Sequence, residues 1–329
     1  MKLSILDQSP IAANQTAQEA LLASTKLAQA GEAFGYTRYW IAEHHDLRGL
    51  ACPAPEVMIS YIGAQTERIR LGSGAILLPH YKPFKVAETF NLLATLFPNR
   101  IDIGLGRAPG GSSEAMVALS GNFIQNVGAF PTLVKDLLHF LDDDYPLDNP
   151  HATLSASPIP NVPPMPWLLG TGKKSAILAS QYGLPYAFGH FMSDEDGAAV
   201  IRQYRETFQA RRAGDTPHVI VSVGVICAET NARAEEVALS YLVSASRLKK
   251  GRGIPSIEEA KQVVLTEQEQ ATFDQLKQQM IIGNPQHVKE ELARLQAHYD
   301  ADEMMLNTIT YALEDRIASY RYIAEAMWG

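Results

Sequence analysis

Eight short apolar runs recur along the chain, and most of them precede a longer stretch with helical periodicity. The runs are Leu3–Leu6, Tyr39–Ala42, Ile69–Leu78, Ile101–Leu105, Trp167–Leu169, Pro185–Phe188, Val219–Ile226 and Glu303–Leu306. Strands that alternate with helices pair in parallel, because each helix returns the chain to the same edge of the sheet. Eight such units favour a closed (β/α)8 TIM barrel, and 329 residues suit a single barrel domain, 1–329, with insertions.

Two of the intervening stretches carry an apolar stripe of the kind that packs a helix against a barrel. The first stripe comprises Phe130, Leu133, Val134, Leu137, Leu138 and Leu141, and the second comprises Ile317, Tyr320, Ala324 and Met327. Both patterns predict outer helices and require no further function.

Two regions exceed what a minimal barrel needs. Asp142–Pro166 is acidic and then proline-rich, which predicts an irregular connection or a short hairpin. Leu248–Gly283 is polar, begins with Lys249-Lys250-Gly251-Arg252 and lies between the last two strands. Long polar insertions in barrels act as lids or remain solvated excursions, so we expect 248–283 to be a mobile insertion.

Charge and composition narrow the class of partner. The chain carries 28 basic and 36 acidic residues, a formal net charge of −8, which argues against nucleic acid or an anionic membrane surface. Cys52 and Cys227 are far apart and lack metal-like spacing, which predicts reduced thiols in the cytoplasm. We expect no signal peptide at Met1–Asp7 and no run of about 18 apolar residues that could span a membrane.

Glu43-His44-His45 follows the second apolar run, where a buried strand would reach solvent. Neighbouring strand residues face opposite ways, so adjacent histidines are poor evidence for a metal site. A catalytic or ligand-orienting imidazole fits better, with Glu43 able to fix its tautomer. We therefore expect His44 to be catalytic, Glu43 to support it and His45 to be structural. A pair of hydrogen-bonded structural histidines is the alternative.

Two glycine-rich segments follow later strands. Arg107 lies in Gly104-Leu105-Gly106-Arg107-Ala108-Pro109-Gly110-Gly111, whose spacing does not match a dinucleotide loop, but an arginine there could bind a phosphate. Thr171, Gly172 and Ser175 lie where a helix should begin, and free amides at a helix N-terminus also favour a phosphate. The alternatives are a tight turn with a surface arginine and simple capping by Thr171.

The third apolar run contains small residues, Gly72-Ser73-Gly74-Ala75. Glycine weakens a strand and often marks a place where a flat ligand lies against backbone, although tight packing at the barrel axis would also explain it. A flat wall, one arginine and one helix N-terminus together suit flavin mononucleotide (FMN) better than a metal or a dinucleotide.

Several of these segments resemble the bacterial-luciferase-like flavin-dependent monooxygenases, in particular single-subunit members. They are Asp7–Pro10, Trp40–His45, Leu71–Pro79, Ile103–Arg107, Gly183–Phe188 and Gly283–Pro285, and the resemblance covers nearly the whole chain. It implies FMN at the carboxyl ends of the barrel strands, with His44 catalytic. It also implies a non-proline cis peptide at Gly74-Ala75 beneath the flavin ring, and a phosphate site made by Arg107, Thr171, Gly172 and Ser175.

The resemblance further implies a homodimer that forms through the helices after strands two and three. The light-emitting members carry a cysteine immediately before the arginine, where this chain has Gly106, so light emission and a long-chain aldehyde are unsupported. Ser175 replaces a threonine and keeps the hydroxyl.

The function expected from the sequence is an FMN-dependent monooxygenase that oxygenates a small organic substrate. It would use O2 and reduced FMN (FMNH2) from a separate NAD(P)H:flavin reductase, because the chain shows no NAD(P)H fingerprint. Three alternatives stay open: a deazaflavin (F420)-dependent hydride-transfer oxidoreductase, a flavin-binding protein without turnover, and a metal-dependent barrel hydrolase.

Overall fold

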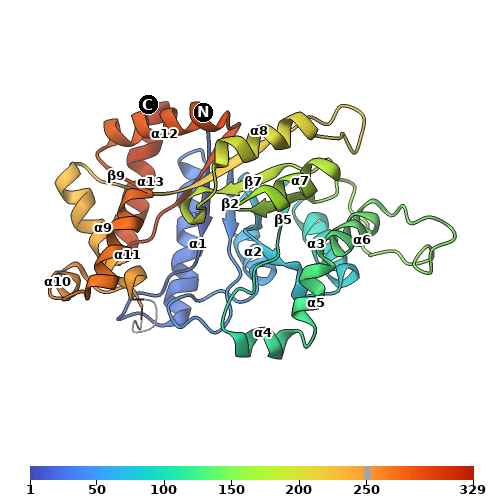
Figure 1. The fold of residues 1–329 in the computed structure, drawn as a ribbon, viewed down its shortest axis with the longest axis horizontal. Coiled ribbons are helices and arrows are strands. Elements are labelled where there is room, and N and C mark those ends of the chain that lie inside the picture. Colours follow the sequence, from blue (N-terminus) through green and yellow to red (C-terminus); the bar gives the residue numbers. More distant parts are fainter. Residues whose placement is uncertain (248–252) are drawn as a thin grey trace.

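The computed structural model describes residues 1–247 and 253–329 and forms a closed parallel barrel (Figure 1). Eight strands pair in the order β1, β2, β3, β5, β6, β7, β8 and β10, and β10 closes the ring by pairing with both β8 and β1. Their bounds are β1 Lys2–Asp7, β2 Arg38–Ile41, β3 Arg70–Ser73, β5 Ile101–Gly106, β6 Met165–Gly170, β7 Tyr186–Gly189, β8 Val219–Cys227 and β10 Glu303–Asn307. The predicted (β/α)8 barrel is confirmed, and each predicted run overlaps a barrel strand.

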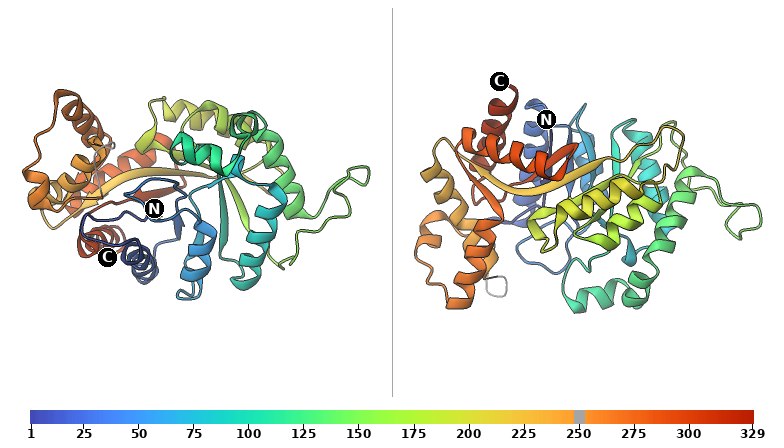
Figure 2. Two further views of the ribbon diagram at one scale, coloured as in Figure 1. Left: turned by 90° about the horizontal axis from the view of Figure 1, so that it is seen from below. Right: turned by 45° about the horizontal axis from the view of Figure 1, so that its top comes forward.

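Helices surround the barrel on its outside (Figures 1 and 2). The outer helices are α1 Ala17–Ala33, α2 Pro55–Gly63, α3 Pro83–Leu96, α6 Phe130–Asp142, α7 Lys173–Gln181, α8 Gly197–Thr207, α9 Asn231–Ser246, α12 Pro285–Tyr299 and α13 Leu313–Trp328. Shorter elements lie in the connections: η1 Leu78–His80, α4 Ser113–Leu119, α5 Phe123–Gly128, η2 His190–Met192, α10 Ile257–Lys261 and α11 Glu267–Gln278.

Local sequence explains why these helices start and pack where they do. Thr16 begins α1 with a capping box, in which its hydroxyl and the Glu19 side chain each accept from the other's backbone amide. Both predicted stripes face inward: Val134 of α6 and Tyr320 of α13 are fully buried. Burying such a side chain contributes about 1.5–3 kcal/mol, so the stripes fix the helices to the sheet.

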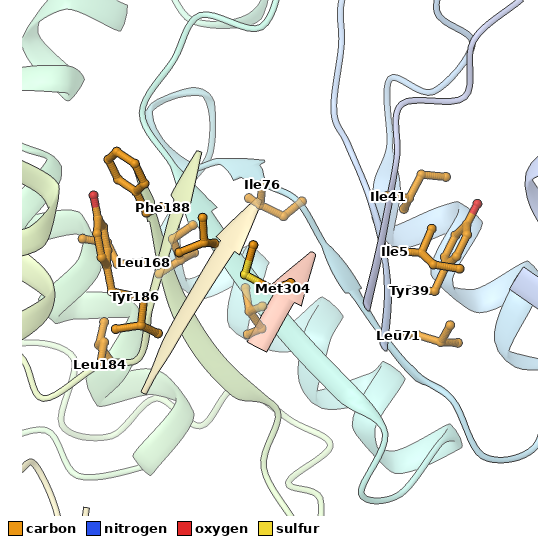
Figure 3. Packing of buried hydrophobic residues seen from close by; sticks show 14 of the residues in the cluster. Ile5, Tyr39, Ile41, Leu71, Ile76, Leu168, Leu184, Tyr186, Phe188 and Met304 are labelled. Carbon is orange, nitrogen blue, oxygen red and sulfur yellow. The ribbon is translucent and has the colours of Figure 1, made fainter. Parts of the chain in front are cut away.

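Side chains leave the barrel strands in two directions. Those that point outward pack under the helices, and Figure 3 shows Ile5, Tyr39 and Ile41 on one side of the barrel with Tyr186 and Phe188 on the other. Those that point inward form a separate apolar layer across the barrel interior: Leu6, Trp40, Trp167, Ala187, Ile220 and Met305. Outward and inward side chains alternate along each strand, as the period of two requires.

A buried ionic layer lies beneath the inner apolar layer, toward the amino ends of the strands. The Arg38 guanidinium donates to Glu303 and to Asp102, at 2.8 Å in each case, and Trp40 Nε1 donates to the same Asp102. All three charged side chains are almost fully buried. Because buried charges need partners, this closed network fills the barrel floor without unpaired carboxylates.

The third predicted strand, Ile69–Leu78, is interrupted. It divides into β3 and β4 (Ile76–Leu77) at a cis peptide between Gly74 and Ala75, and β4 then pairs with β5. The non-proline cis peptide that the resemblance implied is therefore present.

The first insertion takes one of its two expected forms. Residues 143–164 form an irregular connection without a hairpin, and it projects from the barrel (Figure 2). Within the second insertion, 248–252 and so the predicted Lys249–Arg252 start lie outside the described residues. The remainder holds α10, α11 and a further strand, β9 (Met280–Gly283), which extends the sheet by pairing with β8. The sequence analysis missed β9.

Candidate functional site

The candidate site lies at the barrel mouth, by which we mean the carboxyl ends of the barrel strands. Three of the strands, β5, β6 and β7, end in glycine. A Cβ atom on Gly74 would lie 2.6 Å from Leu6 Cδ1, and one on Gly106 would lie 3.0 Å from Ala75 Cβ. A side chain at Gly74 would therefore clash with Leu6, and one at Gly106 would crowd Ala75, so close packing favours small residues where β3 and β5 reach the mouth.

Glu43 is buried at the end of β2 and holds three groups together. Its Oε1 lies 2.8 Å from Nε2 of His45 and accepts from the Tyr81 hydroxyl at 2.9 Å, while its Oε2 accepts from the Leu77 amide at 3.0 Å. One carboxylate thus ties the loop after β2 to the segment that follows the cis peptide. A buried carboxylate with this many donors is well satisfied.

His44 is oriented differently from both of its neighbours. Its backbone amide donates to Cys52 O, but its side-chain Nδ1 is buried and has no hydrogen-bond partner in the described part of the chain. Burial, with a smaller contribution from nearby His45, lowers the pKa of His44 to about 4. Its imidazole is therefore neutral near pH 7 and has an unused ring nitrogen, which is what a proton acceptor or hydrogen-bonding group for a ligand needs.

The expected support of His44 by Glu43 is wrong. The Glu43 carboxylate pairs with His45, two residues away, because residues i and i+2 share a side of an extended chain whereas i and i+1 diverge. The alternation that weakened the metal hypothesis thus also excludes this tautomer-fixing contact. Glu43 contacts His45, Tyr81 and the Leu77 amide and so acts on the loop rather than on His44, while a structural role for His45 stays a prediction.

The loop that carries Arg107 is fastened between two histidines. The His45 amide donates to Gly110 O at 2.8 Å, and His80 Nε2 lies 2.9 Å from Pro109 O. Gly110 has φ of +71°, and a Cβ on Gly111 would lie 1.9 Å from His45 O, so both glycines are required by close backbone approach. The glycines that suggested a ligand loop are thus explained by loop geometry, while Arg107 stays exposed.

The N-terminus of α7 is capped by an acidic side chain from another loop. Gly172 is the N-cap and no side chain of its own segment caps the helix, so capping by Thr171 is wrong. Instead Glu195 Oε2 accepts from the Lys173 amide at 3.1 Å. A Cβ on Gly172 would lie 2.2 Å from Glu195 Oε1, which shows how closely the carboxylate covers this position. A helix N-terminus attracts an anion, and here Glu195 supplies it.

Ser175 lies beside the Tyr186 hydroxyl at this helix end. The Ser175 hydroxyl donates to Gly172 O at 2.8 Å and lies 3.2 Å from the Tyr186 hydroxyl. Burial raises the pKa of Tyr186 to about 12, with Glu195 adding to the rise and Arg107 opposing it. Arg107 and Glu195 therefore both lie within electrostatic range of the same hydroxyl.

Three further residues that shape the mouth were missed. Tyr81 binds Glu43 from 38 positions away, Glu195 reaches α7 from 22 positions away, and Asn307 ends β10 with a buried, unpaired Oδ1 among the described residues. No local spacing signals the first two contacts. Asn307 had one signal, because a polar residue ends an apolar strand there.

The residues that the structure describes provide neither a metal site nor a membrane-spanning helix. Residues 1–247 and 253–329 contain no group of three or more His, Cys, Asp or Glu side chains able to hold a metal ion. Cys52 and Cys227 are buried and unpaired. Of the helices described, none is long and apolar enough to cross a membrane.

A family model described as "Luciferase-like monooxygenase" matches residues 1–301. The chain belongs to this family. It is accordingly an oxidoreductase that incorporates molecular oxygen. The chain is 42% identical to the uncharacterized protein YceB of Bacillus subtilis (strain 168), over 98% of both chains. It is 36% identical to the N-acetyl-S-alkylcysteine monooxygenase of the same organism, over 99% of this luciferase-like chain and 98% of the relative.

Solved structures agree with this placement. Apo-MsnO8 superposes with a TM-score of 0.86 at 32% identity, covering 99% of this chain and 98% of that one. The oxygenating constituent of 3,6-diketocamphane monooxygenase from the CAM plasmid of Pseudomonas putida, solved with FMN, gives a TM-score of 0.72 at 18% identity. That match covers 99% of this chain and 97% of the other, and it is a likeness of fold alone.

Proposed function

We propose that this luciferase-like protein is an FMN-dependent monooxygenase that oxygenates a small organic substrate with O2 and takes FMNH2 from a separate NAD(P)H:flavin reductase. The observation that carries the proposal is the composition of the barrel mouth. Small residues at Gly74-Ala75 after β3, an exposed Arg107 after β5, the N-terminus of α7 after β6, and a neutral His44 after β2 all follow the carboxyl ends of barrel strands. Nδ1 of His44 has no hydrogen-bond partner among the described residues.

The residues present fit an FMN molecule. Gly74 and Ala75 would lie against the flavin ring, because neither residue carries a side chain larger than a methyl group. Arg107, Thr171, Gly172 and Ser175 would hold the phosphate, for which Glu195 would have to leave the α7 amides. Bound FMNH2 would supply the electrons that activate O2.

The remaining chemistry falls to the side chains. His44 Nδ1 would hold or deliver a proton at the reacting atoms, since an imidazole that is neutral near pH 7 can accept one. Glu43 would position the two loops through His45, Tyr81 and Leu77. We also propose that the described part of the predicted insertion, 253–283, moves when a ligand binds. Slower hydrogen exchange in α10 and α11 with FMN than without it would support that movement.

An anaerobic titration with FMNH2 followed by oxygen tests the proposal. We expect saturable binding, and we expect oxygen added in the presence of a substrate to yield an oxygenated product. The same titration with reduced deazaflavin in place of FMNH2 distinguishes the two reactions. Preferential binding of deazaflavin would indicate hydride transfer, whereas preferential binding of FMNH2 would indicate oxygenation. Absence of FMNH2 binding would overturn the proposal, and binding without any oxygenated product would leave a flavin-binding protein.

The substrate class to test first is a thioether. Its support is the 36% identity to a protein named N-acetyl-S-alkylcysteine monooxygenase. N-acetyl-S-alkylcysteines of increasing alkyl length, supplied with FMNH2 and O2, should give products heavier by one oxygen atom. If only substrates without sulfur are oxygenated, the thioether hypothesis is wrong.

The proposal includes a cytoplasmic homodimer. The outer surfaces of α2 and α3 carry exposed apolar side chains, namely Val57, Tyr61, Leu92 and Leu96. Exposed apolar surface that gathers on adjacent helices is typical of an interface between subunits. These residues support the pairing through the helices after strands two and three.

A further inference from the structure

A narrow crevice lies at the barrel mouth beside β8, β9 and β10. Its floor is Gly224 and Asn307, which are partners in the register between β8 and β10. Its apolar walls are Phe191, Tyr241, Leu276, Met280 and Ile309. Gln279 also lines the crevice, and none of the described residues that line it carries a formal charge. A charged group would therefore find no counter-ion among them.

Asn307 is the polar group on the crevice floor. Its side chain is only 4% exposed, and Oδ1 is buried without a hydrogen-bond partner in the described ranges. An unpaired buried amide oxygen costs free energy, so native proteins keep such a group where something else pairs with it. At this position the candidates are a water molecule or a ligand with a hydrogen-bond donor.

Met280 controls how much space the crevice offers. The crevice holds about 300 Å3 when its solvent-open part is included, but its free interior is about 10 Å3, room for one water. A Cβ on Gly224 would lie 3.0 Å from Met280 Cγ, so the methionine side chain covers the glycine. Methionine is unbranched and adopts many conformations, so its rotation would open the floor to a ligand.

The crevice adjoins the place proposed for the flavin. Asn307 is in register with Leu6 of β1, and Leu6 Cδ1 contacts the position where a Gly74 Cβ would lie. Leu6 therefore separates the backbone at Gly74 from Asn307. Phe191 continues the wall, because it packs on the inner barrel layer that contains Leu6. A molecule in the crevice would lie beside a flavin held at Gly74-Ala75.

We propose that this crevice binds the uncharged, mainly apolar part of the organic substrate, and that a hydrogen-bond donor on that part pairs with Asn307. The inference rests on the proposed function, because it places the substrate relative to the flavin. Asn307 is then a specificity-determining residue. A carboxylate elsewhere on the substrate, such as that of an N-acetyl-S-alkylcysteine, would lie outside the crevice, because the described lining offers it no counter-ion.

Ligand-observed NMR titration of the full chain with hexanamide and hexanoate tests the inference. The two probes match in size and differ in charge and in the amide donor. We expect hexanamide to bind at least tenfold more tightly than hexanoate. Asn307→Leu should weaken hexanamide binding about tenfold, whereas the control Gln278→Leu, which removes an exposed amide of α11 outside the crevice, should leave it unchanged.

Met280→Ala provides a second variant in case Asn307→Leu does not fold. Removing the side chain over Gly224 should strengthen hexanamide binding severalfold. Equal affinities for both probes, or no response to either substitution, would overturn the inference. FMNH2 titration of the same samples separates the two proposals. If FMNH2 binds normally but hexanamide and hexanoate bind equally well, only the inference about the crevice is refuted. If FMNH2 does not bind, the proposed function is refuted.

Discussion

Nε2 of His45 lies 2.8 Å from Oε1 of Glu43, and this contact divides the roles within Glu43-His44-His45. Two of the three side chains form a structural unit with each other, which leaves the imidazole between them without a partner among the residues described. A network that fixes the loop therefore also leaves His44 available for a ligand.

Replacing Glu43 by glutamine should destabilise the protein. A glutamine side chain has one acceptor oxygen and cannot serve His45, Tyr81 and the Leu77 amide as the carboxylate does. We expect the free energy of unfolding to fall by about 1–3 kcal/mol, measured by urea denaturation. Glu67→Gln, at an exposed position, is the matched control. If both substitutions lower the free energy of unfolding equally, Glu43 does not stabilise the protein through these contacts.

Replacing His44 by alanine should impair oxygenation while FMNH2 binding changes little. Loss of a proton-transfer group typically lowers a rate by about 10²–10⁴-fold. The measurement is product formation at saturating FMNH2, beside the FMNH2 dissociation constant. His45→Ala is the comparison, and it should lower stability instead, because it breaks the contact with Glu43. Unchanged turnover in His44→Ala would show that His44 is not catalytic and would favour a structural role for the motif.

His44 should also make stability depend on pH. Its folded pKa of about 4 lies below the ordinary value of 6.5, so between these values the unfolded chain binds more protons than the folded one. Stability from neutral His44 is then fully present above about pH 6.5 and is lost as the pH falls toward 4. As the pH falls across this range, the free energy of unfolding of the wild type should decrease by up to about 3 kcal/mol more than that of His44→Gln. Urea denaturation of both proteins at pH 7 and at pH 4.5 measures the difference. Equal losses of the free energy of unfolding in the wild type and in His44→Gln would refute the prediction.

Replacing Glu195 by glutamine should tighten FMN binding. The carboxylate accepts from the Lys173 amide and so competes with a phosphate for the positive end of α7. We expect a two- to tenfold lower dissociation constant for FMN, roughly what one charge at a helix end contributes, and no change for riboflavin, which lacks the phosphate. The neighbouring Asp194→Asn removes the same charge without a contact to α7 and should have a smaller effect. Equal gains for FMN and riboflavin would exclude competition at the phosphate.

Introducing a charge on α2 should separate the proposed subunits. Tyr61 is 47% exposed, beside Val57 on the same helix. Burying a glutamate there would cost more than an apolar interface gains at this position, so Tyr61→Glu should sediment as a monomer while the wild type sediments as a dimer. Val264→Glu, at a 90% exposed apolar residue on the insertion, is the control. A monomeric wild type would end the proposal.

Much of the barrel could be predicted because its signals are local. The apolar runs at Leu3–Leu6 and Val219–Ile226 are strands, and the stripes through Val134 and Tyr320 face the core. The misses have a common cause. β9 was overlooked because Met280–Gly283 is a short run that becomes a strand only by pairing with the end of β8.

The candidate site was only partly predictable for the same reason. Ser175 lies 3.2 Å from the Tyr186 hydroxyl and the charge of Arg107 opposes the rise in the pKa of that tyrosine, while the phosphate site expected from the two residues stays a prediction. The tyrosine itself, Glu195 at α7 and Tyr81 at Glu43 are long-range partners, and their contacts depend on how the loops settle over the mouth.

By itself the sequence determined the eight strands, the faces of the helices and the edge of the barrel where chemistry would lie. Each of these follows from side-chain periodicity or from order along the chain, which neighbouring residues encode. Tertiary structure alone decided that Glu43 holds His45 and not His44 and that Glu195 covers the α7 N-terminus. It also decided that Oδ1 of Asn307 is buried without a partner among the described residues. Such contacts depend on barrel closure, which brings residues far apart in the chain within hydrogen-bonding distance.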